Sequence, residues 1–544
     1  MKNRLCISIG TFIVAYWILP QLICMAQQAQ IRNERVQVFV SDRHLVTGED
    51  LWLDINVFLN EAPSPVKVVY AEILDREGTS VSQQLIGVSK GHARGFLPVP
   101  ENLDTDNYLL RVYTRSSPYT SGETGVYHDI IAVINPESAP NPNAPLPDKQ
   151  LIPKPSSLLS VDKKQYSTQE KVALKIENIP VRENVRLAVR HTIPIQGEKM
   201  DIDWADVYTE KDWEAKQAIP EIYGHVIKGR TVSTPIDTAE VFYLTAHGAS
   251  SHLFITKPNE QGQLLFETGA FRHYDYVVVQ SGKSQDQVNF VLDSPFWPAV
   301  PRESFRLPRL VVDPAHKERI KERILAKSVN QYFIPKSYNP PQDFASVINP
   351  DRSYLLDDYN RFDDIATVIR EYVPHVLIRK QNRKTLFRTY NKPHENMFKN
   401  NPLLLIDAMP VFDADAFAEL NPKNIKRLDL LTRYFFYEKE TFEGVISLTS
   451  FENDFGKFDL PKSALFIEYK GIQVPVENDF TRPPSTARKP DFRNILIWEP
   501  SLSPKNDSIS FTTSQLSGEY QINLSFLHPD TQVWENHILN FSVK

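Results

Sequence analysis

Cysteine is almost absent from this sequence, and both examples lie near its beginning. They are Cys6 and Cys24, and no cysteine occurs after Cys24. A mature chain that starts beyond this point has no disulfide, no thiolate nucleophile and no cysteine-ligated metal. The absence excludes disulfide-stapled folds and cysteine-dependent catalysis.

The first 26 residues have the layout of a secretory signal peptide. Lys2 and Arg4 precede an apolar run over 5–23, and small residues then favour cleavage before Gln27. Two alternatives stay open. The run is an uncleaved anchor, since about 20 apolar residues span a bilayer, or Cys24 carries a lipid. We expect cleavage, and therefore an exported protein.

Glycine is also scarce, and basic residues are fewer than acidic ones. The chain has 19 glycines, 40 prolines and a formal net charge of −6. A sequence with no basic surplus gives no indication of binding to nucleic acid or to an anionic membrane surface. Few glycines, many prolines and 11% aromatic residues favour several compact β-rich units with stiff connections. The length predicts about three to five of them.

Short alternating strands fill most of the chain. The stretch "EDLWLDINVFLN" places Leu51, Leu53 and Ile55 on one face, which predicts a β-sandwich over 30–135. A spacer follows at 136–157, where seven prolines prevent sheet pairing. Further β modules are predicted at 158–220, at 221–297 and, after an intervening region, at 461–544. Whether 158–297 forms one domain or two stays open.

Helical patterns are few. A helical connector is predicted over 298–345, with Asp313 as N-cap and Pro314 at the first helical position. Its charged helix either presents a solvated face or braces two β modules. The apolar spacing of Ile365, Val368 and Ile369 predicts a second helix, and strands follow it. Residues 346–460 therefore form a small α+β domain.

Three segments carry a family resemblance. The texts "PLLLIDAMPVFDADAFAELNPKNIKRLDLL" and "FEGVISLTSFENDFGKF", within 354–459, resemble the plug domain of TonB-dependent receptors. The texts "VYAEILDREG" and "GHARGFLPVPENLDTDNYLLRVYT" are similar to the second macroglobulin domain of α2-macroglobulins. "NEQGQLLF" resembles carboxypeptidase-regulatory, transthyretin-like modules. The order of these segments resembles macroglobulin-like secreted proteins of Gram-negative bacteria.

The resemblance implies a mainly β fold, in which Ig-like or macroglobulin-like sandwiches accompany the α+β plug-like domain at 346–460. Two departures matter. The usual glycine of the plug L-I-D-G turn is Ala408, where a left-handed backbone is strained. About 85 residues follow Asp459, too few for a receptor barrel. A macroglobulin thioester also needs a cysteine, so covalent protease trapping is excluded.

Acidic residues cluster after one apolar strand. Asp407, Asp413 and Asp415 stand within nine positions, a density that acid/base or metal chemistry uses. An aspartate beside a turn proline more often bonds nearby backbone, and we expect that structural role here. No histidine or carboxylate spacing indicates a metal site, and no phosphate loop or dinucleotide motif occurs, so we expect neither metal nor cofactor.

Ser89 lies in "GVSKG", which matches the nucleophile-elbow pattern of hydrolases. The elbow needs a strand that leads into a helix, whereas alternating strand sequence follows Ser89. We therefore expect a coincidence and no enzymatic activity. A hydrolase that uses Ser89 or the Asp407 group remains the last-ranked alternative.

Five aromatic residues within nine positions indicate a contact surface in the α+β domain. They are Tyr434, Phe435, Phe436, Tyr437 and Phe442. One strand face cannot bury all five, so some are expected to bind a partner. The leading hypothesis is a non-enzymatic cell-envelope accessory protein in the periplasm or at the outer membrane. It binds an outer-membrane β-barrel protein, of SusC type or of the assembly machinery, and reaches the membrane through that partner. The alternative is a glycan- or peptide-binding module.

Overall fold

The computed structural model describes the following residues: 33–140, 142, 156–177, 179–180, 184–193, 195–196, 202, 204–208, 218–269, 271–283, 287–312, 317–333, 336–338, 347–476, 480–484, 489–502, 508–528 and 534–544. The predicted signal peptide, both cysteines and most of the proline-rich spacer lie outside them. Unit 1 consists of Met1–Ile222, Phe296–Asn339 and Pro475–Lys544, and unit 2 of Tyr223–Pro295 and Pro340–Val474. No helix among the described residues has the length and apolar character needed to cross a membrane.

The first sandwich of unit 1 confirms the expected alternating strands. One sheet has the order β1-β3-β4, with β7 also paired to β3, and the other has the order β2-β9-β8-β5-β6. The first sheet contains β1 (Glu34–Val40), β3 (Asp50–Leu59), β4 (Ala62–Pro63) and β7 (His92–Pro98). The second contains β2 (His44–Val46), β5 (Val68–Leu74), β6 (Ser80–Gly87), β8 (Asp106–Tyr113) and β9 (Val126–Ile134). Alternate apolar residues of both sheets form the core between them. Two short helices, α2 (Ser117–Thr120) and α3 (Gly122–Gly125), join β8 to β9.

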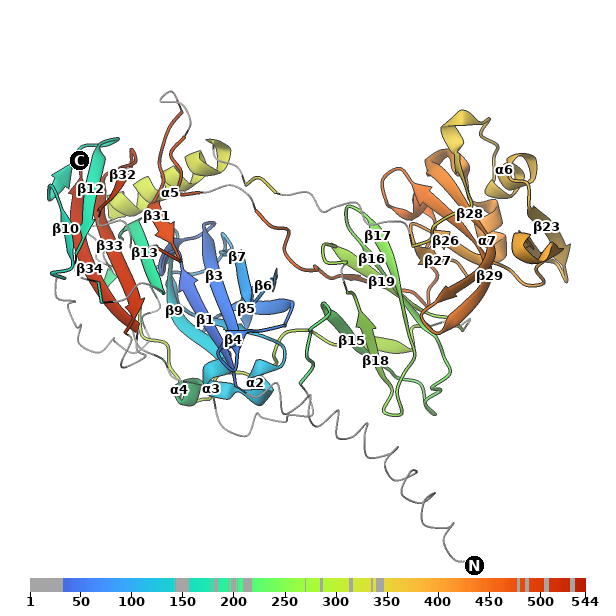
Figure 1. The fold of residues 1–544 in the computed structure, drawn as a ribbon, viewed down its shortest axis with the longest axis horizontal. Helices are drawn as coiled ribbons and strands as arrows, with labels where there is room; N and C mark the ends of the chain where they lie inside the picture. The colour runs from blue at the N-terminus through green and yellow to red at the C-terminus, as the bar shows by residue number, and fades with distance from the viewer. Residues whose placement is uncertain are drawn as a thin grey trace, which may run out of the picture. The chain divides into compact units, whose positions relative to one another are not determined.

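The second sandwich of unit 1 joins segments that the sequence interpretation had separated. Figure 1 shows the green strands of residues 159–191 beside the red strands near the C-terminus. One sheet has the order β10 (Leu159–Val161), β12 (Lys171–Ile176), β32 (Ser508–Thr512). The other has the order β11 (Gln165–Tyr166), β34 (Trp534–Val543), β33 (Gly518–Leu527), β13 (Val185–His191), β31 (Ile495–Glu499). The predicted modules 158–220 and 461–544 are thus not independent, because strands of each complete the other's sheets.

Helix α5 (Lys317–Phe333) braces the two sandwiches of unit 1. Arg323, which is fully buried, bonds Asp42 and Glu49 of the first sandwich, each at 2.9 Å. It also donates to the main-chain carbonyl of His191 in the second sandwich at 3.4 Å. Of the two readings of this charged helix, the structure shows the brace. The predicted cap residues Asp313 and Pro314 lie outside the described residues. The remaining small elements of unit 1 are α4 (Trp204–Val207), β14 (Ile195–Gln196) and β21 (Val311–Val312).

Unit 2 contains a third sandwich, which shows that 158–297 is divided between two units. Its sheets have the orders β18-β15-β20 and β17-β16-β19-β30. The strands are β15 (Val226–Thr231), β16 (Phe242–His247), β17 (Ser251–Thr256), β18 (Gln263–Glu267), β19 (Tyr276–Ser281), β20 (Phe290–Leu292) and β30 (Leu465–Glu468). Strand β30 pairs with β19, so the start of the predicted C-terminal module belongs to this sandwich. The domain to which a strand belongs depends on the strands that it pairs with. The local sequence pattern does not identify those partners.

The rest of unit 2 is an α+β domain, as predicted. Its mixed sheet has the order β22 (Arg352–Leu355), β28 (Ile425–Tyr437), β29 (Glu440–Ser450), β26 (Leu403–Ile406), β27 (Met409–Pro410), with β26 parallel to β29. A second sheet has the order β23 (Val376–Gln381), β24 (Lys384–Asn391), β25 (Asn396–Met397). Helix α6 (Ile365–Tyr372) buries Ile365, Val368 and Ile369 and is capped by Asp364, while α7 (Ala414–Glu419) lies between β27 and β28 in the chain. The fold class is therefore confirmed as mainly β, with sandwich modules and one small α+β domain.

Candidate functional site

Asp407 lies in a turn, where its buried carboxylate bonds nearby backbone and a serine hydroxyl. It forms, with Ala408, the two-residue turn between β26 and β27, and φ is 47° at Asp407 and 67° at Ala408. Both central residues of a type I′ turn need positive φ, so the turn forms here without the usual glycine. The buried carboxylate accepts hydrogen bonds from the Ser450 amide (2.7 Å), the Ser450 hydroxyl (2.6 Å) and the Phe455 amide (2.9 Å). Burial raises the pKa of Asp407.

The two neighbouring aspartates, Asp413 and Asp415, bond other parts of the backbone. Asp413 caps helix α7 by accepting from the amides of Asp415 and Ala416. Asp415 accepts from the Thr385 amide at 2.8 Å. Each of the three carboxylates therefore holds a separate piece of backbone. Among the described residues, no group of three potential metal ligands comes together.

Ser89 lies in a tight hairpin turn. The main chains of Ser89 and His92 exchange two hydrogen bonds, and Lys90 and Gly91 between them have φ values of 53° and 75°. Strand β7 follows directly, without the helix that a nucleophile elbow requires. His92 bonds Asp54 at 2.8 Å.

The five predicted contact aromatics lie on both faces of the β28–β29 hairpin. Phe435, Tyr437 and Phe442 pack against one apolar cluster that includes Tyr243 and Leu253 of the third sandwich. Tyr434 and Phe436 lie on the opposite face, with exposed fractions of 41% and 73%. The alternation of a strand thus divides the five into a packed set and an exposed pair.

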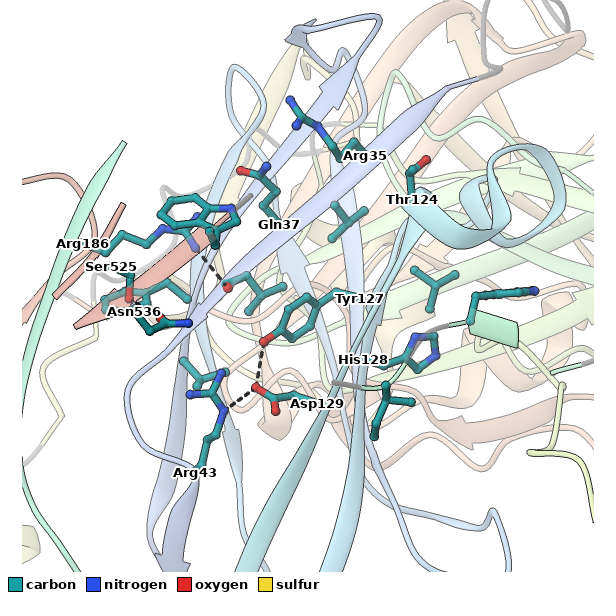
Figure 2. A pocket seen from close by; sticks show the side chains of 18 of the residues that line it. Arg35, Gln37, Arg43, Thr124, Tyr127, His128, Asp129, Arg186, Ser525 and Asn536 are labelled. Carbon is teal, nitrogen blue, oxygen red and sulfur yellow. Dashed lines mark hydrogen bonds and ion pairs between the residues drawn. The ribbon is translucent and has the colours of Figure 1, made fainter. Parts of the chain in front are cut away.

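A cavity lined by several charged side chains lies in unit 1, between β1 and the outer face of the second sandwich. Its volume is about 670 Å³. We call it the arginine groove, because Arg35, Arg43, Arg186 and Arg190 line it, whereas Glu123 and Asp129 are the acidic residues that do so. Figure 2 shows Arg186, Ser525 and Asn536 on one side of β1 and Tyr127, His128 and Thr124 on the other.

Strand alternation places these side chains. In β1, "ERVQVFV", the valines enter the sandwich core while Arg35, Gln37 and Phe39 point outward. In β13, "VRLAVRH", Val185, Leu187 and Val189 belong to the second core. The residues between them, Arg186, Ala188 and Arg190, therefore face the groove.

Arg186 is the distinctive residue of the groove. It is 7% exposed, and its guanidinium lies 3.9 Å from the centre of the Trp534 ring and 5.5 Å from that of Phe39. Its hydrogen bond to the Val38 carbonyl is long, at 3.4 Å. No carboxylate of the described residues forms an ion pair with it. Burial lowers the pKa of Arg186 to about 10, because the charged form is desolvated.

The other arginines of the groove have acidic partners. Arg43 bonds Asp129 at 2.7 Å, and Tyr127 donates to the same carboxylate at 2.8 Å. Arg35 pairs with Glu61 at 2.6 Å, and Arg190 lies 3.9 Å from Asp42. Arg186 is therefore the arginine of the groove that has no salt bridge among the described residues, although the charge of Asp54 acts on it.

Hydroxyl and amide groups complete the floor of the groove. Asn523, Ser525 and Asn536 come from β33 and β34, and the Ser525 hydroxyl bonds both asparagine side chains, at 3.1 and 2.8 Å. Such groups can donate to a carboxylate or bond a peptide or a sugar. The sequence interpretation missed this site, although two arginines at alternate positions of an apolar strand were its visible signal.

No protein-family profile matches this sequence, and no curated protein matches it either. Among solved structures, the chain is similar to the α2-macroglobulin of Salmonella, with 10% identity over 94% of this chain and 23% of that chain, at a TM-score of 0.16. It is similar to trypsin-activated α2-macroglobulin from Escherichia coli, with 10% identity over 94% of this chain and 42% of that one, at a TM-score of 0.22.

The adhesin InvE of Yersinia pseudotuberculosis is another neighbour, with 11% identity over 66% of this chain and 75% of that chain, at a TM-score of 0.15. This chain spans less than half the length of the two macroglobulins.

Proposed function

We propose that this protein is a non-enzymatic, exported binding protein that holds a carboxylate-bearing ligand in the arginine groove. The observation that carries the proposal is Arg186, a buried guanidinium with no carboxylate partner among the described residues. A buried charge without an ion-pair partner is unfavourable, and a ligand carboxylate would supply that partner.

The ligand we favour is an acidic segment of a partner protein in the cell envelope. The rest of the groove suits it, because the charge without a salt bridge is positive and the floor offers Asn523, Ser525 and Asn536. An acidic oligosaccharide shares the carboxylate and also bonds amides. Both probes therefore belong in the test.

The test is isothermal titration of the full chain with acidic peptides and with an oligogalacturonate. Arg186→Met keeps much of the stem that packs on Trp534 but removes the charge, and we expect it to weaken binding about 10- to 100-fold. Arg94→Met is the matched control, since Arg94 also stacks on a tryptophan, 4.8 Å from the Trp498 ring, but does not line the groove. Equal affinities for wild type and Arg186→Met would overturn the proposal.

A second candidate function is favoured by the exposed pair Tyr434 and Phe436. We propose that this pair contacts an outer-membrane β-barrel protein, as the plug-like sequence motifs imply, and that the protein is its accessory subunit. Co-purification from native envelopes tests this idea. Serine at both positions should abolish recovery of the barrel, whereas Tyr332→Ser, which alters a more exposed aromatic of α5, should not.

A further inference from the structure

We propose that the arginine groove takes its ligand as an added β-strand, paired along the free edge of β1. This inference rests on the proposed function and deepens it, because it requires the carboxylate to belong to an extended peptide. Strand addition of this kind obtains affinity from main-chain hydrogen bonds and specificity from alternate side chains.

The first support is the position of β1 at the end of its sheet. Among the described residues, β1 pairs with β3 and with no other strand. Its second edge therefore has no main-chain partner in the ladder. Such an edge presents a row of donors and acceptors to any extended chain that approaches it.

The second support is the pairing register, which tells which groups face the free edge. Just beyond the strand ends, the Ser41 amide bonds the Trp52 carbonyl and the Asn60 amide bonds the Asn33 carbonyl. Hydrogen-bonded pairs alternate along an antiparallel ladder, so the odd-numbered residues of β1 bond β3. The main chains of Val36, Val38 and Val40 therefore point toward the free edge.

The remaining even-numbered residue is already occupied. The amide of Glu34 donates to the Ser121 hydroxyl at 2.8 Å, and its carbonyl accepts from the Thr124 hydroxyl at 2.8 Å. These contacts cap the beginning of the edge. The part left for a ligand runs from Val36 to Val40, where the Val38 carbonyl accepts the long bond from Arg186 at 3.4 Å.

The third support is the path of the cavity. Six consecutive residues, Arg35–Val40, line it. Neighbouring side chains of a strand point to opposite faces, so a cavity lined by every residue in succession follows the edge of the strand. The groove is thus aligned with the groups that an added strand would bond.

The fourth support is the location of Arg186 beside this edge. Its guanidinium reaches the Val38 carbonyl and lies over Phe39, so it is on the face toward which Gln37 and Phe39 point. Every second side chain of an added strand points to the same face. We therefore expect one acidic residue, placed opposite Gln37 or Phe39, to pair with Arg186.

The test uses peptides of about seven residues, the length of an ordinary strand, with a fixed central aspartate and varied flanks. The tightest binder to the full chain is then N-methylated at one amide at a time. Each methylation removes one N–H donor, and a hydrogen bond to β1 is lost only where that amide faces β1, so alternate positions should respond. We expect a loss of about tenfold or more at every second amide and less than about twofold at the amides between them.

The amides that respond are either that of the central aspartate and every second one from it, or the amides between these. One set indicates a strand parallel to β1 and the other an antiparallel strand, and either result supports the proposal. Binding that tolerates methylation at every position, or that fails equally at every position, overturns strand addition. Strand addition also falls if no peptide binds while the oligogalacturonate binds with dependence on Arg186, although the proposed function then stands. Absence of both kinds of binding overturns both.

Discussion

At the scale of single residues, Asp407 holds the end of β29 to the β26–β27 turn. Its carboxylate accepts three hydrogen bonds, two from Ser450 and one from Phe455. An asparagine at this position has one oxygen and presents its NH₂ group to another donor. We expect Asp407→Asn to lower the free energy of unfolding by about 1–3 kcal/mol, as measured by urea denaturation.

The control for this substitution is Asp413→Asn. Asparagine caps a helix as well as aspartate does, so the control should change stability by less than about 0.5 kcal/mol. Equal effects of the two substitutions would contradict the assigned role of Asp407.

His128 makes stability depend on pH. Burial, with a smaller effect of the Arg111 charge, lowers its pKa from 6.5 to about 3. Between pH 6.5 and 3, His128 is therefore protonated in the unfolded state and neutral in the folded state. The free energy of unfolding falls as the pH is lowered toward 3. Within this range His128 lowers the free energy of unfolding by about 1.4 kcal/mol for each pH unit, and at neutral pH it has no such effect.

The substitution His128→Phe tests this dependence, because phenylalanine has a similar size and no titratable group. Urea denaturation at several pH values should give a shallower fall for the variant between pH 6 and 4, two values inside the titration range of about 3 to 6.5. The difference between variant and wild type isolates His128 from the carboxylates. Parallel curves would show that His128 does not titrate as described.

At the scale of elements, β1 is expected to show alternating hydrogen exchange. The amides of Gln37 and Phe39 bond β3, whereas those of Val36, Val38 and Val40 face the groove. In the ligand-free protein the even-numbered amides should exchange faster than the odd-numbered ones. Mass spectrometry with electron-transfer fragmentation of the full chain provides this resolution. Uniform protection along β1 would mean that its second edge is covered.

Local pattern was sufficient for individual elements. Alternation predicted the strands, and the spacing of Ile365, Val368 and Ile369 predicted α6. The partnership of β13 with β31 and β33 was missed, because residues near 190 meet residues near 495 and 521 without any local signature. The arginine groove was missed although Arg186 and Arg190 share one face of β13. It needs β1, β9, β13, β33 and β34 together, and no single strand indicates the others.

The aromatic hairpin shows how far composition alone reaches. Its five aromatics indicated more apolar surface than one strand face buries, which predicted that some would be exposed. The sequence could not say which, since the packed face depends on the third sandwich, whose Tyr243 and Leu253 meet Phe435 and Tyr437. The exposed pair, Tyr434 and Phe436, follows once that face is known.

At the scale of the whole molecule, the chain enters unit 1 three times and unit 2 twice. The described residues of the arginine groove all belong to unit 1, although they lie from Arg35 to Asn536 in the sequence. A linear truncation therefore cannot isolate the groove. Removal of the last segment would take away β31–β34 and with them most of the sheet to which Arg186 belongs.

Arg323 provides a test of unit 1, because its contacts join helix α5 to residues of both sandwiches. It lies in α5, is fully buried and pairs with Asp42 and Glu49. Methionine at this position would leave Glu49 without its ion-pair partner and Asp42 with only the more distant Arg190, and breaking a buried ion pair typically costs about 3–5 kcal/mol. We expect Arg323→Met to destabilise unit 1 by this amount and unit 2 hardly at all.

Hydrogen exchange of the full chain under mild denaturant can follow both units at once. Amides of β8 and β12 report on unit 1, and amides of β16 and β28 report on unit 2. Arg323 bonds the carbonyl of His191 in β13, so β13 is not used as a reporter. Faster exchange in β8 and β12 alone would establish that the parts of unit 1 unfold together, because Arg323 makes its side-chain bonds to other elements and affects these two strands through the shared fold. Equal acceleration in all four strands would mean that the chain unfolds as one cooperative body and that the two units are not energetically separate.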